Sequence, residues 1–278
     1  MIQEVYTLTI RELKKWLSRR GTFVVSLITP LFWLGLFGKS LNFAQMFAPT
    51  NIPPQYSSLI SKYVDQQLLN LFGTTSYFTY LASGMLVVFG FFQSVFGGTN
   101  LVFEKRLGYL NRLLMTPTPR SGIFLSKVFG TLIRILFYET VLILIAWGLG
   151  IKFKPGLTVV NILLAGIAII FVAIGFVSIF AAIAFNVDNV EIMFAIVNLI
   201  NLPLMFASSA LFPLKQMPSW LQEVAKFNPI TYAADIVRYN LVGTPISNYL
   251  LSWIILIVIS ITLFVIGMLV SINAMEKA

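Results

Sequence analysis

Six long apolar stretches make up most of this chain, and they constrain its fold more than any other feature. We place them near residues 21–38, 76–98, 122–149, 158–185, 191–212 and 248–273. Each is close to or above the ~20 residues that an α-helix needs to cross the hydrocarbon core of a bilayer. Backbone groups in lipid must be hydrogen-bonded within the protein, which favours helices. The sequence therefore predicts an all-α polytopic membrane protein with six transmembrane helices.

The composition agrees with a lipid environment and excludes several kinds of chemistry. Charged residues make up 10% of the chain, against roughly 25% in a typical soluble domain. The mean hydropathy is +0.88. The chain contains no Cys and no His, which excludes disulfides, zinc sites built from those ligands and His-based acid–base catalysis. We therefore predict no catalytic residues and no metal site.

Residues 1–20 have the pattern of an amphipathic helix. Ile2, Val5, Leu13 and Trp16 fall on one face at helical spacing, and mostly charged residues fill the other face. A basic amphipathic helix next to an apolar stretch is suited to the membrane interface, with lipid as its partner. An ordinary cytosolic helix is the alternative.

The net charge of +9 is distributed in a way that orients the chain in a membrane. The basic residues lie at the ends of apolar stretches, so we interpret them as orienting charges and expect no nucleic-acid partner. The positive-inside rule then predicts a multi-pass protein of the cell membrane with cytoplasmic N- and C-termini. Two basic clusters carry this prediction: Arg11, Lys14, Lys15, Arg19 and Arg20, and then Lys105, Arg106, Arg112, Arg120 and Lys127.

Two outer connections are long enough to contain helices of their own. The first, about 39–75, contains three prolines and a predicted short helix near 56–71. The second, 213–247, contains two amphipathic stretches that begin at Pro218 and Pro229. Proline is well suited to the first turn of a helix, so we predict short outer helices before the last span. A solvated loop is the alternative.

The inner loop, 99–121, carries the most informative motif. Over 103–115 four leucines recur on one face of a predicted helix, with basic residues at its edges, and Pro117 and Pro119 stop it. An exposed apolar ridge needs a cover, either lipid or a groove on a protein partner. A helix that only anchors the loop in the interface is the alternative.

The residues from Phe103 to Pro117, FEKRLGYLNRLLMTP, resemble the inner-loop motif of the ABC type-2 transporter permeases, the daunorubicin-resistance-like exporters. The outer segment is similar to the same family in its SSALFPL and MPSWL runs, its Asn228-Pro229 pair and its Arg238. The number of spans and the N-terminal helix match too, so the resemblance covers nearly all of one predicted transmembrane domain, 1–278. The long first outer loop departs from the family pattern.

The resemblance implies a permease subunit that is not an enzyme and binds no cofactor itself. ATP and Mg²⁺ would bind to a separate ABC ATP-binding subunit, and two permease subunits, identical or related, would pair with two of these. The 103–115 helix would be the coupling helix, whose leucines sit in a groove on the ATPase and whose polar residues orient it. The coupling residues would be Glu104, Arg106, Leu107, Gly108, Leu110, Arg112, Leu113, Leu114 and Pro117. The outer segment would shape the exit with Pro213, Pro218, Trp220, Pro229 and Arg238.

Few polar side chains fall within the predicted spans. Arg134 and Glu139 are about 140° apart around the third helix, so they do not share a face. Arg134 is near the inner end, and its side chain can extend to the headgroups. Glu139 is deeper, and it faces the subunit interface or the transport path, or pairs with a polar group on another span. Asn198 and Asn201 are candidates for the path or for helix packing.

The function that these patterns favour is ATP-driven export. The cargo is a drug, a lipid, a polysaccharide or a peptide, and the apolar character of the chain favours an amphipathic or lipid-like one. An ion-coupled secondary transporter is the alternative, which predicts interrupted helices in two related halves. A membrane-embedded enzyme would require a catalytic cluster, and the sequence has none.

Overall fold

The computed structural model describes residues 2–18, 20–40 and 57–277. All the regular secondary structure in these ranges is helical, which confirms the predicted all-α class. The three prolines of the first outer loop, and Arg19 of the first basic cluster, lie outside the described residues.

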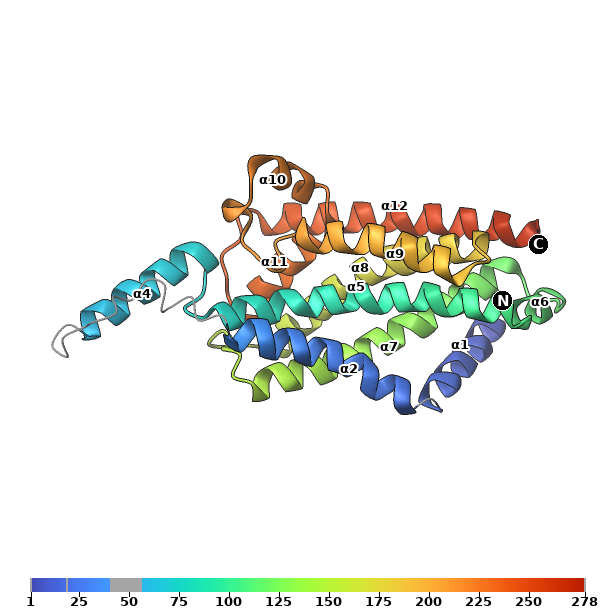
Figure 1. Cartoon of the computed structure of the whole chain (residues 1–278), viewed down its shortest axis with the longest axis horizontal. Helices are drawn as coiled ribbons and strands as arrows, with labels where there is room; N and C mark the ends of the chain where they lie inside the picture. Colours follow the sequence, from blue (N-terminus) through green and yellow to red (C-terminus); the bar gives the residue numbers. More distant parts are fainter. Residues whose placement is uncertain (1, 19, 41–56, 278) are drawn as a thin grey trace.

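The helices run between two ends of the molecule, which we name by the short helices found there (Figure 1). At the α6 end lie α6 (Tyr109–Leu114), the start of α1 (Ile2–Leu17) and the last turn of α12 (Tyr249–Glu276). At the opposite end, the α10 end, lie α10 (Ser219–Lys226) and α4 (Ser57–Phe72). The observed α4 confirms the helix predicted near 56–71.

Four helices of the described chain are long and apolar enough to cross a membrane. They are α12 and three others: α5 (Tyr77–Arg106), α7 (Arg120–Gly148) and α8 (Val159–Asn186). The first predicted span is formed by α2 (Arg20–Trp33) and a π-helical continuation, η1 (Leu34–Lys39). The fifth is α9 (Val190–Phe206), and both of these apolar helices are shorter.

Two span boundaries differ from the prediction. Helix α5 continues to Arg106 instead of ending near 98. Helix α9 ends at Phe206, well before 212, with Pro203 in its last turn. The Asn228 side-chain amide donates hydrogen bonds of 2.6 Å to the carbonyl oxygens of Leu204 and Ala207. These bonds satisfy carbonyl groups that the end of a helix leaves without partners, so the chain can turn there.

Helix α8 lies at the centre of the bundle and packs against α5, α12 and α11 (Pro229–Leu241). Gly267 of α12 allows a close approach of α12 to α8, because a Cβ there would lie 2.5 Å from the backbone of Ser178 on α8. Small residues at such crossings bring transmembrane helices together. On the α5 side, the rings of Phe91 and Phe176 pack edge to face, 4.5 Å between centroids. The core is therefore apolar and close-packed.

Arg238 anchors the segment after α9 to the bundle. It is 2% exposed, and it donates hydrogen bonds to the carbonyl oxygens of Tyr80, 3.2 Å, and Ala210, 2.6 Å. Its guanidinium also lies 3.6 Å from the centre of the Tyr80 ring. Pro229 begins α11 as predicted, and Trp220 of α10 is exposed. The predicted short helices are confirmed, and this segment is not a solvated loop.

Candidate functional site

The predicted coupling helix, 103–115, is two helices in the structure, and this prediction is corrected. Helix α5 ends at Arg106, and α6 begins after Gly108. Gly108 has a φ of +68°, in the left-handed region that glycine adopts without the penalty of a side chain. The Arg120 side chain donates a 2.9 Å hydrogen bond to the Leu114 carbonyl oxygen. The short α6 is therefore held between the end of α5 and the start of α7.

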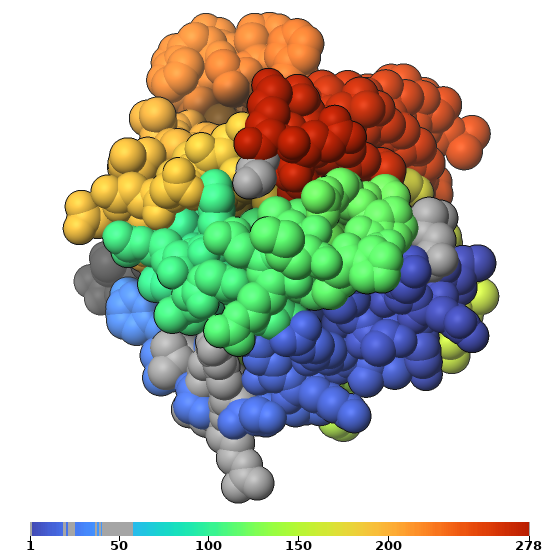
Figure 2. Space-filling view, turned by 90° about the vertical axis from the view of Figure 1, so that its right-hand side faces the viewer, coloured from blue at the N-terminus to red at the C-terminus, as the bar shows by residue number. Residues whose placement is uncertain are grey.

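The predicted ridge of exposed leucines is wrong for two of its members. Leu110 and Leu113 are 2% and 7% exposed, and they belong to the hydrophobic core. Leu107, in contrast, is 76% exposed. Because α6 packs against α5, its apolar face covers the bundle and its other face points away. We call five exposed residues of this loop the tip: Arg106, Leu107, Arg112, Met115 and Pro117. Figure 2 shows this loop, in green, across the middle of the α6 end.

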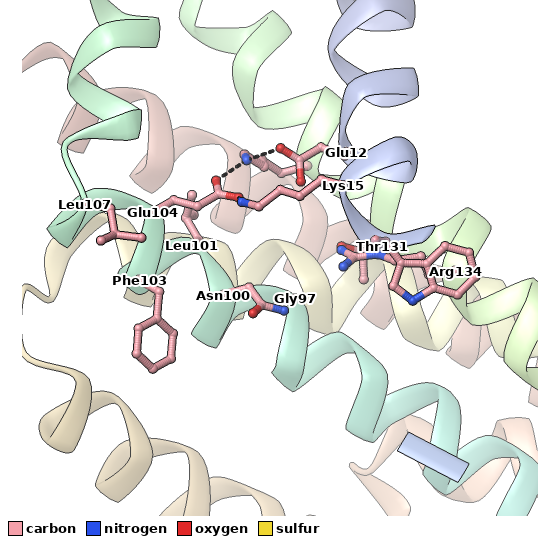
Figure 3. Close-up of a pocket in the computed structure, with 12 residues that line it drawn as sticks. Glu12, Lys15, Gly97, Asn100, Leu101, Phe103, Glu104, Leu107, Thr131 and Arg134 are labelled. Carbon is pink, nitrogen blue, oxygen red and sulfur yellow. Dashed lines mark hydrogen bonds and ion pairs between the residues drawn. The ribbon is translucent and has the colours of Figure 1, made fainter. Parts of the chain in front are cut away.

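A charge cluster of Glu12, Lys15, Glu104 and Lys127 lies behind the tip (Figure 3). Glu104 forms ion pairs with both Lys127 and Lys15, and its side chain is only 6% exposed. The Lys127 ammonium also lies 2.5 Å from the Glu12 carboxylate. The sequence predicted that Glu104 would orient the coupling helix on a partner protein. In the structure its ion pairs join α1, α5 and α7 of the same chain.

The ring of Tyr109 joins α6 to the same unit. The Arg11 guanidinium lies 4.2 Å from the ring centre, and both lysines of the charge cluster lie within 5.6 Å of it. Cations over a tyrosine face are attracted by the ring quadrupole. Further along α1, the Trp16 ring nitrogen donates a 3.1 Å hydrogen bond to the Tyr138 hydroxyl on α7. Charge and aromatic contacts thus connect α1, α5, α6 and α7.

Sequence reasoning missed the cluster partners because they are far apart along the chain. The sequence places Glu12 only on the polar face of the N-terminal helix, Lys15 on that face and among the orienting charges, and Lys127 only among the orienting charges. Lys127 did carry a usable signal, since a lysine inside an apolar stretch requires a partner. Nothing in the sequence indicated which residue that partner is.

Two adjoining cavities lie beside the cluster, with volumes of about 330 Å³ and about 680 Å³. The charge cluster lines the smaller one, and Asn198 and Asn201 line the larger one. Arg134 borders both, so three of the four predicted intramembrane residues meet at one site. The chain is thus a helical membrane protein with cavities between its helices and a protruding loop, as in a transport protein.

Glu139 lies apart from these cavities. It is 4% exposed, and neither of its carboxylate oxygens has a hydrogen-bond partner among the described residues. A Cβ added at Gly90 of α5 would lie 3.6 Å from its Oε1, so the carboxyl faces the α5 side of the core. One alternative from the sequence was that Glu139 pairs with a polar group on another span. No described residue supplies such a hydrogen-bond partner.

Comparison with known proteins identifies the family. Residues 3–242 match the ABC-2 type transporter family, and the chain belongs to it. It is 32% identical to transport permease ycf38 of Porphyra purpurea over 242 residues, 86% of this chain and 74% of that protein. It is 27% identical to the doxorubicin resistance ABC transporter permease protein DrrC of Mycobacterium tuberculosis over 168 residues, 58% of each chain. Daunorubicin resistance permease DrrB1 of Streptomyces coeruleorubidus is 24% identical over 173 residues, 62% of this chain and 60% of that one.

Family membership confirms the resemblance drawn from the inner-loop and outer-segment motifs. The protein is a multi-pass membrane permease of an ABC-2 type transporter and has no ATPase activity itself. ABC permeases pair with ATP-binding subunits, which bind the nucleotide. The alternative of an ion-coupled secondary transporter is thereby set aside.

Proposed function

We propose that this chain is the transmembrane subunit of an ATP-driven exporter in the cell membrane. Residues 1–278 form one domain in which α2 with η1, α5, α7, α8, α9 and α12 cross the bilayer. The tip and both termini are cytoplasmic, in agreement with the basic residues gathered near the α6 end. Two permease subunits, identical or related, assemble with two ATP-binding subunits.

The observation that carries this proposal is the tip. Leu107 and Met115, 76% and 90% exposed, stand beside two basic side chains, Arg106 and Arg112, at the end of the bundle. An apolar surface of this kind needs a cover, and its basic edges favour a partner with acidic groups. The tip residues would contact the ATP-binding subunit.

The remaining coupling residues act inside the chain in this proposal. Gly108 allows the reversal between α5 and α6, and Leu110, Leu113 and Leu114 hold α6 on the bundle. Glu104 joins α5 to α1 and α7 through the charge cluster. A displacement of α6 on ATP binding would therefore move these three helices together. ATP shifts the transporter between its inward- and outward-facing states by binding them with different affinities.

Export is favoured over import by the named relatives, which include doxorubicin and daunorubicin resistance permeases. Arg134, Asn198 and Asn201 line the larger cavity and would contact the cargo, an amphipathic, lipid-like, drug or polysaccharide molecule. At the α10 end, Arg238 with Pro213, Pro218, Trp220 and Pro229 would shape the exit. Glu139 would change its surroundings when the helices move.

The test is a charge placed on the tip. We expect Leu107→Asp to abolish co-purification of the ATP-binding subunit and ATP-dependent transport, while the permease still inserts and folds. Leu59→Asp is the matched control, since Leu59 on α4 is 62% exposed at the other end. Leu110→Asp should instead unfold the protein, because that leucine is buried. Unchanged capture of the ATP-binding subunit by the Leu107→Asp variant would refute the coupling role of the tip.

A further inference from the structure

The larger cavity has a polarity that the proposed function does not by itself explain. It lies between α2, α5, α7 and α9, and no acidic residue lines it within the described chain. Phe89, Phe92 and Phe194 contribute to an apolar wall, whereas Asn100, Thr131 and Arg134 form a polar edge shared with the smaller cavity. Figure 3 shows Arg134 and Thr131 at the opposite side of the smaller cavity from Leu107.

Arg134 brings a positive charge to this edge that no carboxylate neutralises at close range. Its Nε donates to the Gly130 carbonyl oxygen, 3.1 Å, and its Nη2 to the Thr131 hydroxyl, 2.8 Å, both on its own helix. No ion pair joins it to any described carboxylate, and its Nη1 has no hydrogen-bond partner among the described residues. Glu12 and Glu104 of the nearby charge cluster attract Arg134 through space, but neither forms an ion pair with it, and both already face ammonium groups.

A guanidinium at membrane depth with only neutral partners is costly, and an anion placed against it would reduce that cost. Arginine is also suited to this task, because its planar fork can bind phosphate or carboxylate through two hydrogen bonds. The volume of about 680 Å³ lies in the range of sites for small ligands. The aromatic wall suits an apolar body attached to such an anionic group.

We propose that the cargo is an amphipathic anion, whose charged group binds Arg134 and whose apolar part lies against Phe89, Phe92 and Phe194. This inference rests on the proposed function, because it names the class of cargo for the same permease. It excludes cationic and uncharged molecules of the same size as preferred cargo. The asparagines of α9 complete the site by hydrogen bonding to polar atoms of the cargo.

The experiment measures binding to the purified permease alone, so it does not depend on the ATP-binding subunit. The permease is placed in phosphatidylcholine nanodiscs and titrated with oleoyl lysophosphatidic acid. The comparison probes are oleoyl lysophosphatidylcholine, which has the same chain without net charge, and glycerol 3-phosphate, which has the headgroup alone. We expect the anionic amphipath to bind at least about tenfold more tightly than either.

Variants of Arg134 then locate the charge. Arg134→Gln should weaken binding of lysophosphatidic acid about tenfold and leave lysophosphatidylcholine unchanged. Arg134→Lys, which keeps the charge but loses the planar fork, should weaken binding of lysophosphatidic acid by less, about threefold. Lys152→Gln, which removes an exposed cation outside the cavity, is the matched control. An unchanged preference in Arg134→Gln, or equal binding of the two lysolipids by the wild type, overturns the proposal.

A second measurement separates cargo from a lipid that merely coats the protein. The assembled transporter in phosphatidylcholine vesicles should move fluorescent lysophosphatidic acid on addition of ATP, and Arg134→Gln should lose this selectively. Charge-dependent binding without ATP-driven movement, in a transporter that moves another molecule, overturns the cargo assignment. Failure of the permease to capture any ATP-binding subunit would instead refute the proposed function, and the binding data would stand.

Discussion

Replacing Lys127 by methionine should destabilise the fold strongly, because this ammonium joins two carboxylates in the charge cluster. The variant leaves Glu12, 12% exposed, without an ion pair among the described residues, while Glu104 retains Lys15. Removing one partner of a buried ion pair costs about 3–5 kcal/mol. Since one pair survives and a cavity adjoins the cluster, we expect the lower limit, about 3 kcal/mol, or roughly a hundredfold in the unfolding equilibrium.

The free energy of unfolding is measured in mixed micelles of dodecyl maltoside and increasing dodecyl sulfate, followed by circular dichroism. Lys226→Met is the matched control, since it breaks a 2.6 Å pair with Glu223 whose side chains are 58% and 66% exposed. Exposed pairs contribute about 1 kcal/mol or less. In the double variant Lys127→Met/Glu104→Gln, the free energy of unfolding should fall by about 1–2 kcal/mol less than the sum of the decreases in the two single variants. Equal effects of Lys127→Met and Lys226→Met, or strict additivity, would refute the reasoning.

Three further predictions concern stability in the same micelle assay. Gly84→Ala should lower the free energy of unfolding by about 3 kcal/mol, because the added Cβ would overlap the carbonyl oxygen of Ala210. Gly166→Ala is the control and should be neutral or slightly stabilising, because a Cβ there meets open space. Asn228→Ala should cost about 2 kcal/mol, because two carbonyl groups of the α9 end and the α11 cap lose their partner. The simple cap removed by Asn248→Ala should cost about half as much. Glu139→Met should raise the free energy of unfolding by about 1 kcal/mol, since it replaces a buried carboxyl that has no hydrogen-bond partner among the described residues. A decrease would show that Glu139 has a partner outside these residues.

The sequence predicted the fold well where the local pattern was strong. Apolar length located α5, α7, α8 and α12, and prolines located the starts of α10 and α11. It failed at the ends of α5 and α9. The end of α9 depends on Asn228, which reaches back to it from the α11 cap. Such a contact has no local pattern, so the predicted end at 212 was too late.

For the candidate site, the sequence located the inner-loop motif but not the direction in which its residues point. The spacing of Leu107, Leu110 and Leu113 predicted one apolar ridge, yet only Leu107 is exposed. The break at Gly108 turns the following leucines into the bundle and separates them from Leu107. Helical periodicity cannot reveal this, because it assumes that the helix continues.

By itself the sequence determined that the chain lies in a membrane and belongs to a family of permeases, because length, hydropathy and ordered motifs are properties of the chain alone. The tertiary structure decided which charges neutralise one another. Glu12 and Glu104 are 115 and 23 residues from Lys127 in the sequence, yet both form ion pairs with it. Among the charges at this site, Arg134 alone faces a cavity without forming an ion pair with a described carboxylate. Ion pairs depend on distance in space, which only the packing of α1, α5 and α7 sets.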